Sequence, residues 1–155
     1  MAAAAPQAGE LVTEGLLYRW VPNTEDSFDY EEKKPCKLAF RPDKGERGIS
    51  VFLADLLNSP GDVVSDLPGY GVCQFTVGQL LAEARRLRAD RGNRFDEEIT
   101  ITYEPTKQPT KGQAHCYIQP VPAVVQKALY KRVAAMTPEF LPDAAVAGFD
   151  PDRDP

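Results

Sequence analysis

The single histidine of the chain, His115, is followed directly by Cys116, one of three cysteines. A thiol beside an imidazole could act as a nucleophile with its base. Neighbouring residues of a strand point to opposite faces of a sheet, however, so these two side chains cannot share a hydrogen bond. We therefore expect no catalytic residue here, and we expect Cys116 to be a small buried residue. His115 faces the same side as Tyr117, either as part of a binding surface or as an ordinary residue of the sheet.

The sequence does not predict a metal centre. Its three cysteines, Cys36, Cys73 and Cys116, form no CxxC pair, and one histidine supplies no ligand cluster at a recognised spacing. An odd number of separated cysteines also argues against a disulfide framework. We predict reduced thiols, no metal and no cofactor.

Four polar side chains could form a ligand site. Arg19 and Arg41 each neighbour large apolar residues in predicted strands. Together with Ser50 and His115, they could converge on one polar face of a sheet. Guanidinium groups bind phosphate and other anions through paired hydrogen bonds, so such a face would suit an anionic ligand. The alternative is a surface face on which both arginines pair with carboxylates.

One family resemblance rests on two short segments. Leu17–Arg19 (LYR) lies in the first predicted strand, and Ser50 lies in a later strand, Ile49–Ala54. This order resembles ADP-ribosyltransferase-like and related NAD-consuming domains, which place an arginine and then a polar strand residue. The resemblance implies a small nucleotide-ligand-binding or NAD-using enzyme. Such domains usually carry a late glutamate in the cleft, for which Glu104, in or beside a proline-rich loop, is the nearest candidate.

Established catalytic signatures are absent: there is no phosphate loop, serine-hydrolase elbow, zinc-protease motif or dinucleotide fingerprint. Long loops and apolar tails often contact other proteins. The sequence therefore favours a non-enzymatic protein-binding or adaptor module of bacterial type over an enzyme. Its partner contacts would be the 56–70 loop and the C-terminal tail, with Phe140, Leu141, Val146 and Phe149 as apolar anchors.

The strands that would position these residues show as short apolar or alternating runs. We predict strands over 15–21, 99–103 and 113–119. The stretch Lys37–Asp55 reads as a hairpin, with apolar runs Leu38–Phe40 and Ile49–Ala54 around a connector rich in glycine and proline. Its predicted core residues are Leu38, Phe40, Ile49, Val51 and Leu53.

Two helices are expected to cover this sheet. Thr76 followed by Gln79 matches a capping box, and the apolar positions from Val77 to Leu87 recur at helical spacing. A second helix is predicted from Ala123 to Met136. Residues 23–35 read as an acidic surface loop with possible anchors at Phe28 and Tyr30, and residues 56–71 read as a long loop.

Together these elements predict one α+β domain with about five antiparallel or mixed strands and both amphipathic helices on one face. We expect a flexible lead-in over 1–12, the domain over 13–136, and an extended tail rich in proline and aspartate over 137–155. The formal net charge of −5 makes nucleic acid an improbable partner, even with arginines clustered between 85 and 94. The first residues lack the features of a secretory signal, and no apolar run is long enough for a membrane span, so we expect a cytoplasmic protein.

Overall fold

The computed structural model describes residues 6–42, 46–90, 98–121, 126–136 and 138–141. Their main feature is a sheet of six antiparallel strands in the order β6-β7-β4-β1-β5-β8. The strands are β1 (Leu16–Val21), β4 (Ile49–Leu53), β5 (Gly71–Thr76), β6 (Thr100–Tyr103), β7 (His115–Gln119) and β8 (Glu139–Phe140). A separate short pair, β2 (Phe28–Asp29) and β3 (Lys34–Pro35), lies within the acidic segment, where Phe28 and Tyr30 are buried. The predicted α+β class is confirmed.

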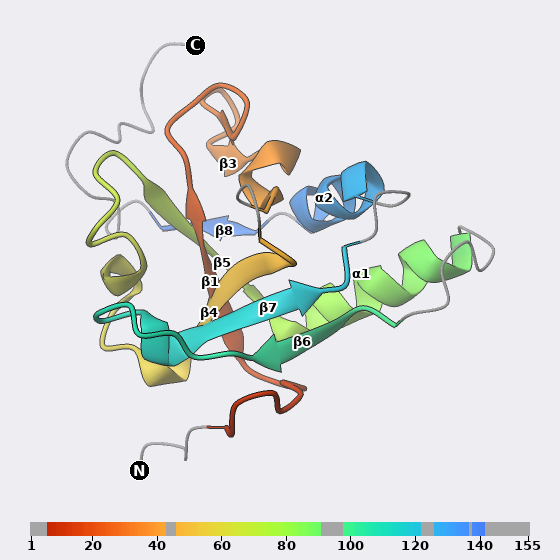
Figure 1. Cartoon of the computed structure of the whole chain (residues 1–155). Coiled ribbons are helices and arrows are strands. Elements are labelled where there is room, and N and C mark those ends of the chain that lie inside the picture. The colour runs from red at the N-terminus through yellow and green to blue at the C-terminus, as the bar shows by residue number, and fades with distance from the viewer. Residues whose placement is uncertain (1–5, 43–45, 91–97, 122–125, 137, 142–155) are drawn as a thin grey trace.

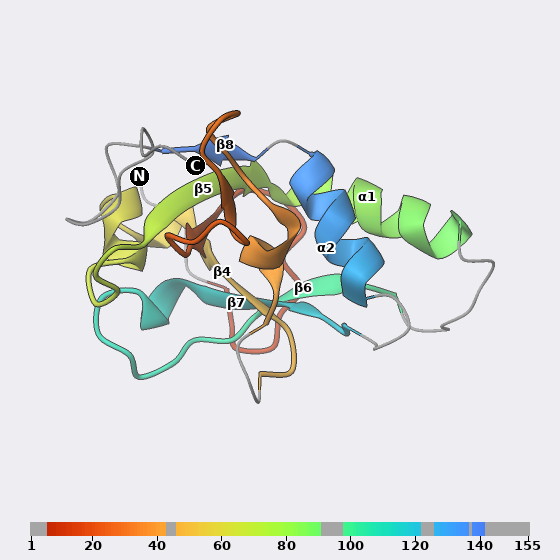
Figure 2. The same cartoon turned by 90° about the horizontal axis from the view of Figure 1, so that it is seen from above.

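Two helices pack on one face of the sheet, α1 (Val77–Asp90) and α2 (Gln126–Ala135). The capping box forms as predicted, because Gln79 N donates to Thr76 Oγ1 at 3.1 Å and Thr76 N donates to Gln79 Oε1 at 2.9 Å. Both helices lie at the same side of the sheet in two perpendicular views (Figures 1 and 2). Apolar residues from the helices and from alternate strand positions, such as Leu80, Leu129 and Val51, form the larger core. We call this side the helix-covered face.

The opposite face is covered by short 3-10 turns instead of long helices. They are η2 (Ala54–Leu56), η3 (Pro60–Val63) and η4 (Gly112–Ala114), and they gather at the side of the molecule away from α1 and α2 (Figure 1). Val63 and Val64 are fully buried there against Tyr18 and Phe52. Much of the segment predicted as a long loop is therefore packed onto the sheet. We call this side the loop-covered face.

The predicted strand over Leu38–Phe40 is wrong. These residues form a 3-10 turn, η1 (Lys37–Phe40), in which Ala39 N donates to Cys36 O at 3.0 Å. The carbonyl of Ala39 accepts a hydrogen bond from a buried arginine rather than from a neighbouring strand. Phe40 is fully buried as predicted, whereas Leu38 is only partly buried. The hairpin prediction thus holds only for its second arm, β4.

Strand β5 was not predicted, although it pairs with β1 along its whole length. The predicted lead-in and the predicted tail also pair with strands of the sheet. Gly9 N donates to Tyr103 O at 2.7 Å and Val12 N to Ile101 O at 2.8 Å, so part of the lead-in runs along β6. On the other side β8 pairs with β5. None of the helices in the described ranges is long and apolar enough to cross a membrane.

Candidate functional site

The centre of the candidate site is a hydrogen bond between Ser50 of β4 and His115 of β7. Ser50 Oγ lies 2.9 Å from His115 Nε2, and His115 Nδ1 lies 2.8 Å from the backbone oxygen of Glu104. A carbonyl oxygen can only accept, so Nδ1 carries the ring proton and Nε2 accepts the Ser50 hydroxyl proton. The sheet register fixes this arrangement, because Ser50 pairs with Tyr117 and Phe52 with His115. One tautomer and one direction of the hydroxyl are therefore selected.

The His115 ring is held in a largely dry position. Its side chain is 6% exposed and lies edge-on to the rings of Phe52 and Tyr117, with centroids 5.5 and 4.5 Å away. Burial lowers the pKa of His115 to about 4. The ring is therefore neutral at neutral pH, in the tautomer that the hydrogen bonds require.

The charged groups around this ring act on its pKa in both directions. Glu46 raises the pKa, whereas the cations of Arg47, Lys111 and Arg19 lower it. Glu46 and Arg47 come from the connector before β4, Lys111 from the loop before β7, and Arg19 from β1. The cations reinforce the effect of burial.

Ser50 and His115 line a pocket of about 270 Å³ on the loop-covered face. Its walls combine aromatic rings with polar groups, and they also include Trp20, Glu46, Phe52, Leu67, Tyr70, Thr106, Gln108, Lys111 and Tyr117. Such a mixture of apolar walls with a few converging polar groups is typical of small-molecule sites. Ser50, although only 5% exposed, lines this pocket.

Lys111 supplies a buried cation to this pocket. Its side chain is 3% exposed, and its ammonium donates to Val63 O at 2.9 Å and to Asp66 Oδ1 at 2.7 Å. Although burial raises the pKa of Asp66, the hydrogen bond and charge of Lys111 bring it below its usual value. Lys111 also lies 5.3 Å from the Trp20 ring centroid. This one side chain therefore ties the segment around η3 to the loop before β7.

That loop is closed by a tight backbone contact at Gly112. Thr106 N donates to Gly112 O at 2.9 Å, and a Cβ at Gly112 would lie 2.5 Å from Thr106 O. Any side chain at this position would force the loop open. Glycine is thus required for the turn that places Lys111 and, three residues beyond Gly112, His115.

Glu46 and Tyr117 form the solvent side of the pocket. The Tyr117 hydroxyl donates to the Glu46 carboxylate, and Arg47 lies over the Tyr117 ring at 5.2 Å from its centroid. Burial and the hydrogen bond to Glu46 raise the pKa of Tyr117 to about 12. Arg47 in turn pairs with Glu104, whose carboxylate also accepts from Thr102 at 2.9 Å. Glu46 is thus the glutamate that lines this pocket, and Glu104, the nearest candidate for the cleft glutamate of the resembled family, is not among its lining residues.

Arg19 lies on the helix-covered side of β1, where its pairing partner is Cys73. Its guanidinium is 1% exposed and donates to three backbone oxygens: Ala39 at 3.0 Å, Ser50 at 2.8 Å and Arg41 at 2.9 Å. The register of β1 with β4 includes Leu17–Leu53 and Tyr18–Phe52, and Arg19 is the next residue along β1. Arg19 therefore bridges β1 to β4 and η1 at the point where the pairing of β1 with β4 ends. Its hydrogen bond to the Ser50 carbonyl fixes the backbone of Ser50.

Arg41 contributes its backbone oxygen to this bridge, and its side chain is exposed. Arg19 and Arg41 line a second pocket of about 540 Å³, separate from the one that contains Ser50 and His115. Trp20 and Tyr70 line both pockets, so the two hollows adjoin. The four predicted ligand residues are thus divided between two neighbouring pockets rather than gathered on one face.

The other residues singled out in the sequence occupy structural positions. Cys73 and Cys116 are fully buried in the larger core, and burial raises the pKa of each thiol to about 12. Phe140 packs against Phe28 with ring centroids 4.7 Å apart, and Leu141 N donates to Val72 O at 2.8 Å. These two anchors contact the domain itself. The other two, Val146 and Phe149, lie outside the described residues.

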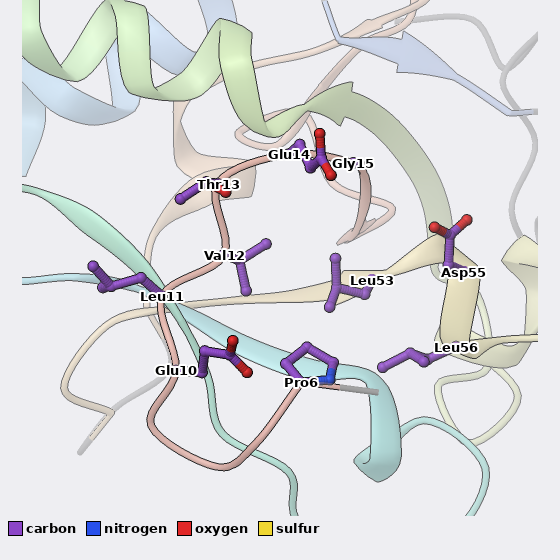
Figure 3. A pocket seen from close by; sticks show the side chains of 10 residues that line it. All are labelled: Pro6, Glu10, Leu11, Val12, Thr13, Glu14, Gly15, Leu53, Asp55 and Leu56. Carbon is purple, nitrogen blue, oxygen red and sulfur yellow. The ribbon is translucent and has the colours of Figure 1, made fainter. Parts of the chain in front are cut away.

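A third hollow of about 590 Å³ lies where the segment before β1 passes the end of β4. Figure 3 shows the residues that line it, Pro6 and Glu10 to Gly15 from the segment before β1, and Leu53, Asp55 and Leu56 from the end of β4 and η2. The described residues that line it include three carboxylates and no lysine, arginine or histidine. It holds none of the four predicted ligand residues. No group of three His, Cys, Asp or Glu side chains within the described ranges could hold a metal ion.

Several site residues were missed by the sequence analysis. Lys111 sits in a polar loop that reads as solvent-exposed, and only the adjacent Gly112 hints at a constrained turn. Trp20 was expected only as a residue of the strand over 15–21, and Tyr70 only as part of the partner-binding 56–70 loop. Contacts between segments distant in sequence bring them together, so local patterns carried little signal for them.

Comparison with known proteins gives little further guidance. No family model matches the chain, and no solved structure matches it. A homoserine O-acetyltransferase from Schizosaccharomyces pombe is 29% identical over 99 residues, which is 64% of this chain and 18% of that protein. The chain therefore spans less than a fifth of the length of this curated relative. The similarity is local and does not assign the chain to a family.

Proposed function

We propose that this protein binds a nucleotide ligand, such as NAD or a fragment of it, across the two adjoining pockets. The observation that carries the proposal is the shared wall formed by Trp20 and Tyr70. On one side of this wall lies the fixed Ser50–His115 hydrogen bond, and on the other lie the two arginines. An elongated ligand with polar groups at separated positions suits this arrangement.

Each part of a nucleotide has a matching group in the two pockets. The rings of Trp20 and Tyr70 offer apolar surface for stacking a base or a nicotinamide. The Ser50 hydroxyl, whose proton is donated to His115, offers its oxygen as an acceptor for a ribose hydroxyl. The exposed guanidinium of Arg41 suits a phosphate in the second pocket.

Arg19 supports the same proposal in a different role from the one expected. Its guanidinium is occupied by three backbone oxygens, so we assign it to positioning. It fixes the backbone of Ser50 from one side while His115 fixes the hydroxyl from the other. Its positive charge adds to the potential of the second pocket, which it lines.

Isothermal titration with NAD, ADP-ribose, AMP and nicotinamide tests the proposal. A ligand at 100 times its dissociation constant would add about 2.7 kcal/mol to the free energy of unfolding, so a thermal-shift assay offers a second readout. We expect Ser50→Ala and Trp20→Ala to weaken binding by about 10-fold or more, or about 1.4 kcal/mol. Ser65→Ala, at an exposed serine, should bind as the wild type does. Absence of binding by all four compounds at millimolar concentration would refute the proposal.

Binding to a protein partner stays a prediction from the sequence. Since Phe140 and Leu141 pack against the domain, we now rest that prediction on the 56–70 loop and on Val146 and Phe149. A chain ending at Leu141 keeps β8 and removes those two anchors. If it recovers the same proteins as the full chain in a pull-down, the tail has no part in partner binding.

A further inference from the structure

The Ser50–His115 pair has a property that ligand binding alone does not need. Three groups form an ordered chain: the Ser50 hydroxyl donates to His115 Nε2, and His115 Nδ1 donates to the backbone oxygen of Glu104. Distances of 2.9 and 2.8 Å place each donor within normal hydrogen-bond range. A nucleophile next to a base, with the base oriented by a third group, is the geometry that activates a serine.

The surroundings maintain this geometry in the state that the chemistry requires. His115 is neutral at neutral pH, because burial lowers its pKa to about 4, so Nε2 holds a lone pair for the serine proton. A histidine with such a low pKa is a weaker base than one near pH 7, which favours slow acylation over rapid turnover. Lys111 also lines this pocket, where its ammonium is paired with Asp66.

The two buried cysteines offer no comparable nucleophile. Cys116 follows His115 but lies on the helix-covered face, and burial raises its pKa to about 12. Cys73 is fully buried on that same face. Among the described residues that line the pocket, Ser50 is the hydroxyl group bonded to a neutral imidazole.

We infer that Ser50 is an activated nucleophile that accepts the acyl group of a small carboxylic ester, with His115 as its general base. Ser50 Oγ attacks the carbonyl carbon while its proton moves to His115 Nε2. The bond from that carbon to the ester oxygen then breaks, and the proton passes from Nε2 to the departing alkoxide, which leaves as an alcohol. Water can then attack the carbonyl carbon of the acyl-serine while its proton moves to His115 Nε2. The bond from that carbon to Ser50 Oγ breaks, the proton returns from Nε2 to Oγ, and the carboxylic acid leaves. This activity goes beyond nucleotide binding and does not depend on it.

Diisopropyl fluorophosphate is a small probe for this reactivity. The bond from Ser50 Oγ to phosphorus forms, the phosphorus–fluorine bond breaks, and the proton passes to His115 as fluoride leaves. We expect one stable adduct in the intact mass of the protein, mapped to Ser50 by peptide sequencing. Ser50→Ala should abolish the adduct, and His115→Gln should slow its formation by about 100-fold or more. Ser65→Ala, an exposed serine outside the pocket, should react like the wild type.

A second readout separates reactivity from folding and from ligand binding. Each variant is first compared with the wild type by circular dichroism, so that a misfolded variant is recognised, and p-nitrophenyl acetate is then tested for a burst of nitrophenolate. Absence of both adduct and burst in the folded wild type, or an adduct confined to other residues, would overturn the inference. Labelling that NAD slows would support both proposals, whereas labelling unaffected by NAD would support the nucleophile and count against the shared nucleotide site.

Discussion

The two faces of the sheet are buried to a similar degree but are chemically different. On the helix-covered face Val51 and Cys116 are 0% exposed, and on the loop-covered face their neighbours Ser50 and His115 are 5% and 6% exposed. The apolar pair needs only close packing, whereas the polar pair needs fixed partners. The strand register supplies those partners, because β4 and β7 bring the serine and the imidazole together. A hydrogen-bonded polar pair can thus lie on one face of a sheet while the next residue along each strand is part of the apolar core on the other face.

Short covering segments leave room for pockets beside the sheet. Long amphipathic helices such as α1 and α2 cover the sheet with apolar side chains. Loops and 3-10 turns leave hollows between their side chains, and both pockets of the candidate site are lined partly by such segments. Among the described residues, no buried side-chain nitrogen or oxygen lacks a hydrogen-bond partner. The polar face is therefore fully satisfied rather than strained.

Removing Arg19 should have the largest effect, because this residue bridges β1 to β4 and η1. Arg19→Met would leave three backbone oxygens without their donor. Since each unsatisfied buried group costs about 1–3 kcal/mol, partly relieved by relaxation, we expect a loss of about 3–5 kcal/mol in the free energy of unfolding by urea titration. Arg85→Met, at an exposed arginine of α1, should change it by less than about 0.5 kcal/mol. Equal stability of the two variants would contradict the bridging role.

The next largest expected effect is on the pH dependence of the protein's stability, through His115 on the loop-covered face. The pKa of His115 is about 4 in the folded protein and 6.5 ordinarily. Between these values the unfolded chain binds more protons than the folded one, so stability falls as pH falls from 6.5 to 4. We expect a loss of up to about 3 kcal/mol over this window in urea titrations.

A variant without the titrating ring provides the control for that window. His115→Gln should remove most of this dependence, while Asp66, with its lowered pKa, loses its contribution only below its ordinary value of 3.8. If wild type and His115→Gln lose stability in parallel between pH 6.5 and 4, the ring is not held neutral by burial.

Lys111 should matter less, because its partner Asp66 is half-exposed and can be solvated. Lys111→Met leaves the Val63 oxygen without this donor, and we expect a loss of about 1–3 kcal/mol. Lys107→Met, at an exposed lysine of the same loop, is the matched control and should be nearly neutral. If Lys107→Met destabilises the protein as much as Lys111→Met does, the link that Lys111 makes between η3 and the loop before β7 contributes no specific stability.

The smallest expected effect is on stability alone, through the cap of α1 on the helix-covered face. Thr76→Ala removes the cap of α1 and should cost about 1 kcal/mol of stability. Thr76→Ser retains the cap and should recover most of that loss. Neither change should alter ligand affinity in calorimetry, since Thr76 lines neither pocket of the candidate site. A matching loss of affinity in Thr76→Ala would show that the two faces are coupled.

Local patterns were enough to predict much of the fold. The alternating residues of β6 and β7 and the capping box of α1 are signals carried by neighbouring residues, and all three elements are present. Strand β5 was missed because its six residues mix apolar positions with Gln74 just before a strong helix start. Leu38–Phe40 was misread because its apolar residues fit a strand, whereas the donor that fixes the turn, Arg19, comes from far away in the sequence.

The candidate site was predictable only in part for the same reason. Strand alternation alone placed His115 and Tyr117 on one face, and Ser50 was expected to converge with His115; the register pairs Ser50 with Tyr117. The division of the four ligand residues between two pockets depends on where the pairing of β1 with β4 ends, which no local pattern indicates. Lys111 and Tyr70 enter the site through loops whose closure depends on contacts with distant segments.

Nuclear magnetic resonance of the nitrogen-15-labelled chain during titration with NAD tests the proposed ligand site most directly. We predict saturable shifts of the Trp20 indole and of the Ser50 and His115 amides, with little change at Leu80 or Leu129 on the helix-covered face. The same titration of Ser50→Ala should saturate at higher NAD concentration. An unchanged spectrum at millimolar NAD, or shifts confined to residues away from both pockets, would contradict the assignment of the two adjoining pockets as a nucleotide site.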